Sequence, residues 1–166
     1  MGRASLTRRV RFRATHRYHR PDWDEARNRA TFGTCAAPEP HGHDYACDVT
    51  VTGEIDPRTG MVLDLGVLDH ILDEQVVRPF HGRSLNDAAP EFRPGGLIPT
   101  CEELARLVAQ RVSAALAALA TQPVPPGHES IAARAADAQH SAMGVRVHSV
   151  RVAEDDTLGA TWTEQA

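Results

Sequence analysis

The sequence has few cysteines, no uninterrupted long apolar run and no excess of positive charge. Three cysteines in 166 residues, with no charged and then apolar leader before the first predicted strand, favour a reducing cytosol over secretion. The longest apolar run is alanine-rich and contains Arg111 and Ser113, so we expect no membrane-spanning segment. A formal net charge of -4 argues against a polyanionic partner, and we expect no nucleic-acid binding. These features predict a cytoplasmic protein.

Some of the histidines, in contrast, lie on strand faces that the hydrophobic pattern predicts to be buried. The run from His41 to Val51 alternates, and His41 and His43 share their face with Tyr45 and Cys47. In a strand the two imidazoles would lie about 6.6–7 Å apart. Two buried imidazoles need partners. A shared metal ion would supply them, and so would ordinary hydrogen bonds, so this pair alone leaves both readings open.

A third histidine ends another alternating run. Val10 and Phe12 lie on its apolar face, and His16 has the same parity. If the two strands pair antiparallel with these ends together, three imidazoles converge. Three histidines suit a catalytic zinc site, because the fourth position stays open for water or substrate. The alternative is a set of unrelated histidines, since the chain has nine. We predict zinc bound by His16, His41 and His43.

The remaining pattern predicts one α+β domain over residues 1–166. The order is strand, strand, helix, helix, strand, strand, without repeats at solenoid periods. Loops are expected at residues 19–40 and 80–99, a surface insertion at about 122–142, and the last strands at 145–154 and 158–162.

Both predicted helices have capping signals. Asp64 is expected to cap a helix that buries Leu65, Leu68, Leu72 and Val76 and ends at Pro79. Thr100 and Glu103 form a capping box that opens the second helix. Its inner stripe is expected to consist of Leu104, Val108, Ala115, Leu116 and Leu119.

A series of short motifs, in order and spacing, carries a resemblance over nearly the whole chain outside residues 122–142. They include Phe12-Arg13-Ala14-Thr15-His16, Phe32-Gly33-Thr34-Cys35, His41-Gly42-His43-Asp44-Tyr45, Asp56-Pro57-Arg58-Thr59-Gly60, Leu85-Asn86, Pro99-Thr100-Cys101-Glu102 and Val152-Ala153-Glu154. Together they resemble the 6-pyruvoyl-tetrahydropterin synthase and 6-carboxytetrahydropterin synthase family. The resemblance implies a T-fold: two helices on one face of a four-stranded antiparallel sheet. It also implies a homo-oligomeric ring, a hexamer or tetramer, with sites between subunits.

The resemblance assigns the three histidines to zinc and makes Cys35 the catalytic cysteine. A thiolate near a zinc-bound substrate can move the adjacent proton, provided that positive charge lowers its pKa. Without the motif, Cys35 would be read as an inert loop thiol. Cys101, at a predicted helix N-terminus where the pKa of a thiol is lowered, is the weaker rival, and Cys47 is expected to be core packing.

Three further residues match the family's pterin contacts. Glu154 has inward parity with Val150 and Val152, and a carboxylate suits a ring that offers two parallel N–H donors. Thr100 and Glu102 match a second contact region. Simple helix capping is the alternative role of Thr100.

One departure from the family pattern concerns catalysis. The family places an Asp-His pair before Leu85-Asn86, where this chain has His81 and Gly82. Leu68-Asp69-His70 spells the missing tripeptide but lies inside the first predicted helix, so we interpret it as a decoy. His81 is one position early and is kept as a candidate catalytic helper that needs a rearranged loop. Loss of such a relay costs about 10²–10⁴-fold in general acid–base catalysis.

The combined prediction is a zinc-dependent lyase that acts on the small molecule 7,8-dihydroneopterin triphosphate or a close analogue. Its reaction would be triphosphate elimination, or rearrangement or cleavage of the side chain. The alternative is a diverged member with altered or lost catalysis that binds a pterin or another heterocycle. Candidate cationic contacts for the triphosphate are Arg13, Arg17, Arg27 and Arg29.

Overall fold

The computed structural model describes residues 2–121, 137, 139, 140 and 142–164. Most of the predicted insertion at 122–142 lies outside these residues. The elements in chain order are β1 (Arg3–His16), α1 (Glu25–Phe32), η1 (Gly33–Ala36), β2 (His41–Glu54), α2 (Leu65–Leu72), η2 (Asp73–Val77), α3 (Arg78–Phe80), β3 (Arg83–Ser84), α4 (Leu85–Ala88), η3 (Pro90–Phe92), α5 (Cys101–Thr121), β4 (Arg146–Ala153) and β5 (Gly159–Thr163).

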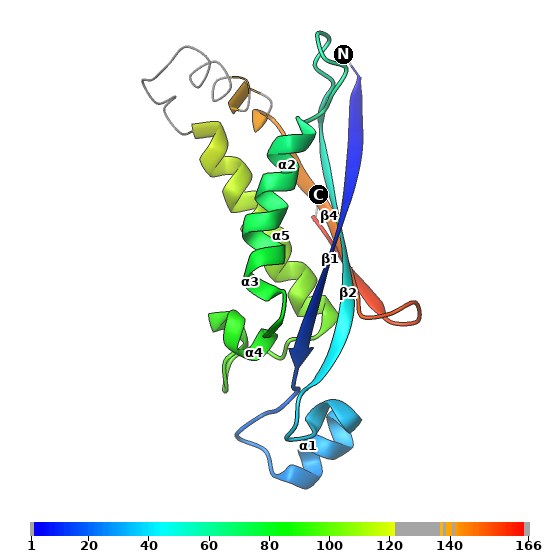
Figure 1. Cartoon of the computed structure of the whole chain (residues 1–166), viewed down its shortest axis with the longest axis vertical. Helices are drawn as coiled ribbons and strands as arrows, with labels where there is room; N and C mark the ends of the chain where they lie inside the picture. The colour runs from blue at the N-terminus through cyan, green and yellow to red at the C-terminus, as the bar shows by residue number, and fades with distance from the viewer. Residues whose placement is uncertain (1, 122–136, 138, 141, 165–166) are drawn as a thin grey trace.

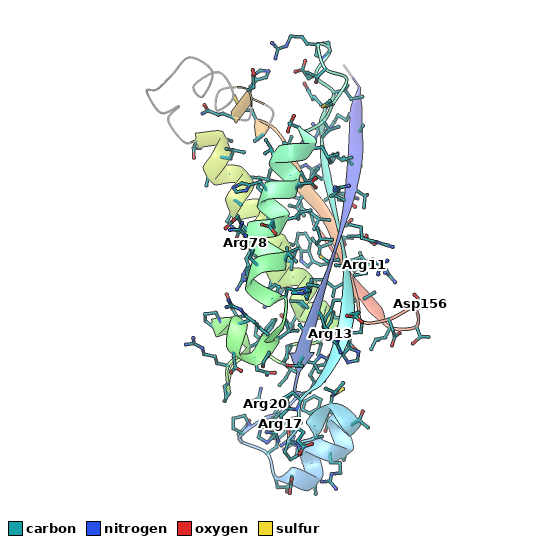
Figure 2. All side chains as sticks on the ribbon, viewed as in Figure 1. Arg11, Arg13, Arg17, Arg20, Arg78 and Asp156 are labelled. Atoms are coloured by element: carbon teal, nitrogen blue, oxygen red, sulfur yellow. The ribbon has the colours of Figure 1, made fainter. Side chains whose placement is uncertain are left out.

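A long antiparallel hairpin of β1 and β2 forms the frame of the molecule (Figure 1). Its register runs without a break from the pair of Arg3 and Glu54 to the pair of His16 and His41. The predicted parity is confirmed on both strands, since the apolar face of each is buried against the helices. Its buried members are Phe12, Ala14, His16, Tyr45, Cys47, Val49 and Val51. The opposite face is polar, and Figure 2 shows Arg11 and Arg13 on the side of the sheet away from the helices.

Within the described residues, the sheet is mixed and has five strands in the order β3-β1-β2-β4-β5. β1, β2, β4 and β5 pair antiparallel, whereas β3 pairs parallel with the end of β1. The expected four-stranded, purely antiparallel sheet is therefore wrong in number and in one pairing. β3 has two residues, which is too short for any alternation to reveal it in the sequence.

The helical segment from α2 to α3 covers one face of the sheet together with α5 (Figure 1). Asp64 caps α2 by accepting a hydrogen bond from Val67 N–H, as predicted. Leu68, Leu72 and Val76 are buried, but Leu65 is 42% exposed and does not belong to the buried stripe.

The helical segment passes through Pro79 and ends at Phe80, so the predicted end at Pro79 is wrong. A π-helical turn, η2, precedes the proline, and in it Arg78 N–H bonds to Asp73 O. A wider turn of this kind lets a helix include a residue that has no N–H to donate.

The second predicted helix corresponds to α5, which packs on β4 and β5. Thr100 Oγ1 accepts a hydrogen bond from Glu103 N–H, which confirms the cap. Leu104, Val108 and Leu116 of the predicted stripe are buried, and Ala115 and Leu119 are partly buried against the same core. Among the described residues, α5 alone has the length and mean hydropathy, 1.2, of a membrane-spanning helix. The core helix of a globular protein meets the same criteria, and the buried side of α5 faces the sheet.

Both predicted loops contain regular structure. The segment 19–40 holds α1 and η1, and 80–99 holds β3, α4 and η3. α1 begins at the N-cap Asp24 and has no apolar stripe, so periodicity could not predict it. It projects beyond the end of the β1–β2 hairpin (Figure 1). The only buried residue of α1 is Asn28, whose amide bonds to the backbone of Arg20, Trp23 and Asp24 and so closes the segment.

Candidate functional site

Three histidines converge where the β1–β2 hairpin meets α1. His16 ends β1, His41 begins β2 directly opposite, and His43 follows on the same face. One nitrogen of each ring lies within 4.8 Å of the others, and His16 Nε2 is 3.1 Å from His41 Nε2. His16 is fully buried, and the other two rings are half-buried. The structure thus brings the three predicted ligands together in a group that could hold a metal ion.

The chemistry of this group fits a metal ion. Nitrogens bound to one tetrahedral zinc at about 2.0–2.1 Å lie roughly 3.3 Å apart, close to the separation of His16 and His41. His43 Nε2 is buried and has no hydrogen-bond partner among the described residues. Such a buried nitrogen is costly unless another group, such as a coordinated metal ion, interacts with it. Burial, and then the neighbouring His41 and His43, lower the pKa of His16 to about 3. Its ring is therefore neutral at pH 7, the form that binds metals.

Glu154 directly follows β4 and lies beside the three histidines. It is only 6% exposed. Its Oε1 accepts hydrogen bonds from the hydroxyls of Tyr18 at 3.2 Å and Tyr45 at 3.5 Å, and it is 3.5 Å from His16 Nδ1. Its Oε2 is 3.7 Å from His43 Nε2. Burial, and then the charge of this carboxylate, raise the pKa of both tyrosines, so both hydroxyls keep their protons.

Cys35 reaches the same group from η1. Its Sγ is 3.7 Å from His41 Nε2, and Tyr18 N–H donates to Cys35 O at 2.8 Å, which holds η1 against the chain that leaves β1. Burial, and then the charge of Glu154, raise the pKa of the thiol, while a hydrogen bond with Thr34 lowers it. The side chain is therefore a thiol at pH 7 unless a nearby cation stabilises the thiolate.

Comparisons with known proteins identify the fold and the family. The model of the family described as 6-pyruvoyl tetrahydropterin synthase matches residues 5–165. The chain belongs to this family. The 6-pyruvoyl tetrahydrobiopterin synthase of Homo sapiens is 37% identical over 102 residues, which are 61% of this chain and 69% of the human protein. That of Poecilia reticulata is 35% identical over 113 residues, 68% of this chain and 76% of the fish protein.

Solved structures of the 6-pyruvoyl tetrahydropterin synthase family share the fold. The Caenorhabditis elegans enzyme has a TM-score of 0.74 at 23% identity, over 99% of this chain and 98% of that chain. The Plasmodium vivax enzyme has a TM-score of 0.59 at 11% identity, over 100% of both chains. The resemblance that the sequence motifs predicted is thereby confirmed.

His81-Gly82, which the motif spacing sets where the family pattern is expected to have an Asp-His pair, lies on the outer edge of β1. Gly82 N–H donates to Arg13 O at 2.7 Å, and Arg13 N–H donates to His81 Nδ1 at 3.3 Å. Gly82 has φ of +72°, a conformation that a histidine rarely adopts. Within one chain the structure does not bring His81 into contact with Cys35.

The motif Leu68-Asp69-His70 lies inside α2, in agreement with its interpretation as a decoy. The Asp69 carboxylate binds the Arg8 guanidinium on β1 through two hydrogen bonds, at 2.6 and 2.9 Å. His70 is exposed. Neither residue contacts the three histidines among the described contacts.

The predictions for the residues at the start of α5 are only partly confirmed. Thr100 caps the helix, and Glu102 is exposed in its first turn; their roles as substrate contacts stay predictions. The lowered pKa expected for Cys101 is wrong, because burial and then the charge of Glu154 raise the pKa of this thiol to about 12. The helix N-terminus therefore does not activate Cys101.

Strand alternation predicts that Tyr45 is buried but assigns it no role, and no pattern in the sequence singles out Tyr18. Both hydroxyls donate to Glu154. A buried tyrosine hydroxyl needs a hydrogen-bond partner, so the parity of Tyr45 already indicated a polar group across the sheet. The identity of that group depends on the register of β2 and β4, which the sequence does not fix.

Proposed function

We propose that this protein is a zinc-dependent lyase that acts on 7,8-dihydroneopterin triphosphate or a close analogue. The observation that carries the proposal is the convergence of three histidine nitrogens beside a thiol and a buried carboxylate, in a chain of this family. Relatives that carry the name 6-pyruvoyl tetrahydrobiopterin synthase support the reaction class.

Glu154 is proposed to bind the heterocycle. Its Oε1 already accepts from two tyrosine hydroxyls, so the carboxylate is fixed before substrate arrives. A fixed carboxylate suits a pterin, whose amino group and ring N–H lie side by side and can donate two parallel hydrogen bonds. Its position next to His16 and His43 would place the side chain of a bound pterin near the three histidines.

Cys35 is proposed to move the proton. When bound by His16, His41 and His43, zinc would polarise the oxygen atoms of the substrate side chain and acidify the neighbouring C–H. Cys35, with its Sγ 3.7 Å from His41 Nε2, would act as the thiolate, the form that a bound cation favours, and would take up that proton and then return it as the thiol.

Among the candidate cationic contacts, Arg17 lies nearest the site. It follows His16, and its Nε donates to Ala36 O beside Cys35. With His19 and Arg93 it lines a cavity of about 200 Å³, to which Asp87 also contributes. Arg17 and Arg20 lie near α1 at the end of the hairpin (Figure 2). We propose that the cations of this cavity bind the phosphate chain.

Arg27 and Arg29 have weaker claims. The Arg27 guanidinium lies over the Trp23 ring, 4.1 Å from its centroid, and is engaged there. Arg29 is exposed on α1, and Arg13 lies on the polar face of the sheet (Figure 2).

A ring of subunits, a hexamer or tetramer, is proposed as the assembly. In the described chain, the outer edge of β1 from Arg3 to Arg13 has no partner strand, and the outer edge of β5 has none. Exposed edges of this length favour pairing with another chain. Light scattering coupled to size exclusion tests the assembly: a mass of one chain would contradict it.

A second function is favoured by the presence of His81-Gly82 at the position where the resemblance predicts an Asp-His pair. A diverged member could bind a pterin or another heterocycle and catalyse a different reaction or none. Zinc and the Glu154 contact would be retained in such a protein.

Incubation of zinc-loaded protein with 7,8-dihydroneopterin triphosphate distinguishes the two functions. Release of triphosphate with a new pterin product, detected by mass spectrometry, is the expected result. Binding of the pterin without any chemical change would contradict the lyase proposal and support the second function. His70→Ala is the matched control, because His70 is an exposed histidine away from the three ligands, and its activity should equal that of the wild type.

A further inference from the structure

The hydroxyl of Tyr45 lies between a proposed metal ligand and the proposed substrate-binding carboxylate. Its distance to His16 Nδ1 is 2.6 Å, the shortest contact of that ring, and its distance to Glu154 Oε1 is 3.5 Å. All three side chains are buried. A hydroxyl can accept one hydrogen bond while it donates another, so the order of donors along this chain determines which nitrogen of His16 carries a proton.

Only one order of donors makes both contacts of the Tyr45 hydroxyl hydrogen bonds. Glu154 only accepts, so Tyr45 donates its proton to Glu154 Oε1 and accepts from His16. His16 then carries its proton on Nδ1, and Nε2 is left with a lone pair. That nitrogen is the one that lies 3.1 Å from His41 Nε2, on the side where an ion would bind.

We infer that Tyr45 is a positioning residue that holds His16 in the Nδ1–H tautomer, with Nε2 directed at the metal site, and links that ligand to Glu154. The inference rests on the proposed zinc site. Partners of this kind behind a metal-binding histidine fix the ring and raise its basicity, and their loss weakens metal binding about 10–100-fold.

Two variants separate this role from general packing. The Tyr45 ring stacks on Phe12, with centroids 5.1 Å apart and planes at 13°, and Tyr45→Phe keeps that ring while it removes the hydroxyl. Tyr18→Phe is the matched control. Tyr18 also donates to Glu154 and also packs its ring on His16, but its hydroxyl makes no hydrogen bond to His16 Nδ1 among the described contacts.

The first measurement is zinc affinity, by competition with a chelating dye. Tyr45→Phe is expected to bind zinc about 10–100-fold more weakly than the wild type, and Tyr18→Phe as tightly as the wild type. The second is ¹⁵N NMR of the imidazoles in the metal-free proteins. We expect the Nδ1–H tautomer of His16 in the wild type and in Tyr18→Phe, and its loss in Tyr45→Phe.

Glu154 Oε1 is itself 3.5 Å from His16 Nδ1 and is the competing acceptor. If Tyr45→Phe keeps both the Nδ1–H tautomer and the zinc affinity of the wild type, Glu154 alone orients the ring and the inference is wrong. If instead the wild type binds no zinc, the proposed function fails. The tautomer of the metal-free protein then still decides whether Tyr45 controls His16.

Discussion

Glu154 is the side chain at which the contacts of the site meet. It accepts from Tyr18 and Tyr45 and lies beside two of the three histidines. Burial, and then the charge of this carboxylate, raise the pKa of Cys35, Cys101 and both tyrosines. In the metal-free protein the thiols and phenols of the site therefore stay protonated. A bound cation would favour their deprotonated forms.

The substitution Cys35→Ser tests the role of the thiol. It should lower kcat by about 10²–10⁴-fold, because a hydroxyl is a far weaker acid than a thiol and cannot carry the proton. Zinc content should stay at the wild-type level, since the three histidines are intact. Steady-state kinetics and elemental analysis on the same preparation check both points. A variant with wild-type kcat would remove Cys35 from the mechanism.

The buried His16 ring should make the stability of the metal-free protein depend on pH. Its pKa is about 3 in the folded protein against 6.5 for an ordinary histidine. Between these values the unfolded chain binds a proton at His16 that the folded chain does not. The free energy of unfolding should therefore be highest above pH 6.5 and should fall by up to about 1.4 kcal/mol per pH unit below it.

Urea unfolding of the metal-free protein at pH 7 and pH 5 measures this dependence. His16→Gln should show a smaller loss between the two pH values than the wild type, whatever its absolute stability. Equal losses in the two proteins would show that another group is responsible.

At the scale of elements, the β1–β2 hairpin was the most predictable part of the fold. Strand alternation assigns every second residue to one face, so a single register fixes where Phe12, His16, His41 and Tyr45 point. The contact of Tyr45 with Glu154 was not predictable, because it depends on how β4 is paired. The register of β2 and β4 shifts between Thr50 and Val51, and no pattern in the sequence predicts this irregularity.

The missed elements are short or lack periodicity. α1 has no apolar stripe and is stabilised by the Asp24 cap and the buried amide of Asn28. β3 spans two residues. Pro79 misled the prediction of the helix end, because the effect of a proline depends on whether the preceding turn can widen, as η2 does.

Thr100 allows a test at the N-terminus of α5. Thr100→Ala removes the hydroxyl that accepts from Glu103 N–H and should cost about 1 kcal/mol of folding stability. Thr100→Ser retains a capping oxygen and should stay close to the wild type. Chemical denaturation of the three proteins measures the difference. If Thr100→Ala is as stable as the wild type, the cap is not significant, and a raised KM in that variant alone would favour substrate contact.

For the whole molecule, zinc should act as a folding ligand. An ion that binds the folded chain through three converging histidines, and the unfolded chain weakly, stabilises the fold by about 2.7 kcal/mol at a free concentration 100 times Kd. Chelation should lower Tm, and added zinc should restore it. His148→Gln, which removes an exposed histidine of β4, should respond like the wild type. Identical melting with and without zinc would exclude this contribution.

The central claim is that His16, His41 and His43 bind one metal ion. Anomalous diffraction from crystals of the zinc-loaded protein, recorded above and below the zinc absorption edge, tests it most directly. The account predicts one anomalous peak per chain, within bonding distance of one nitrogen from each of the three rings. A map with no peak there, or with the metal held by other residues, would contradict it.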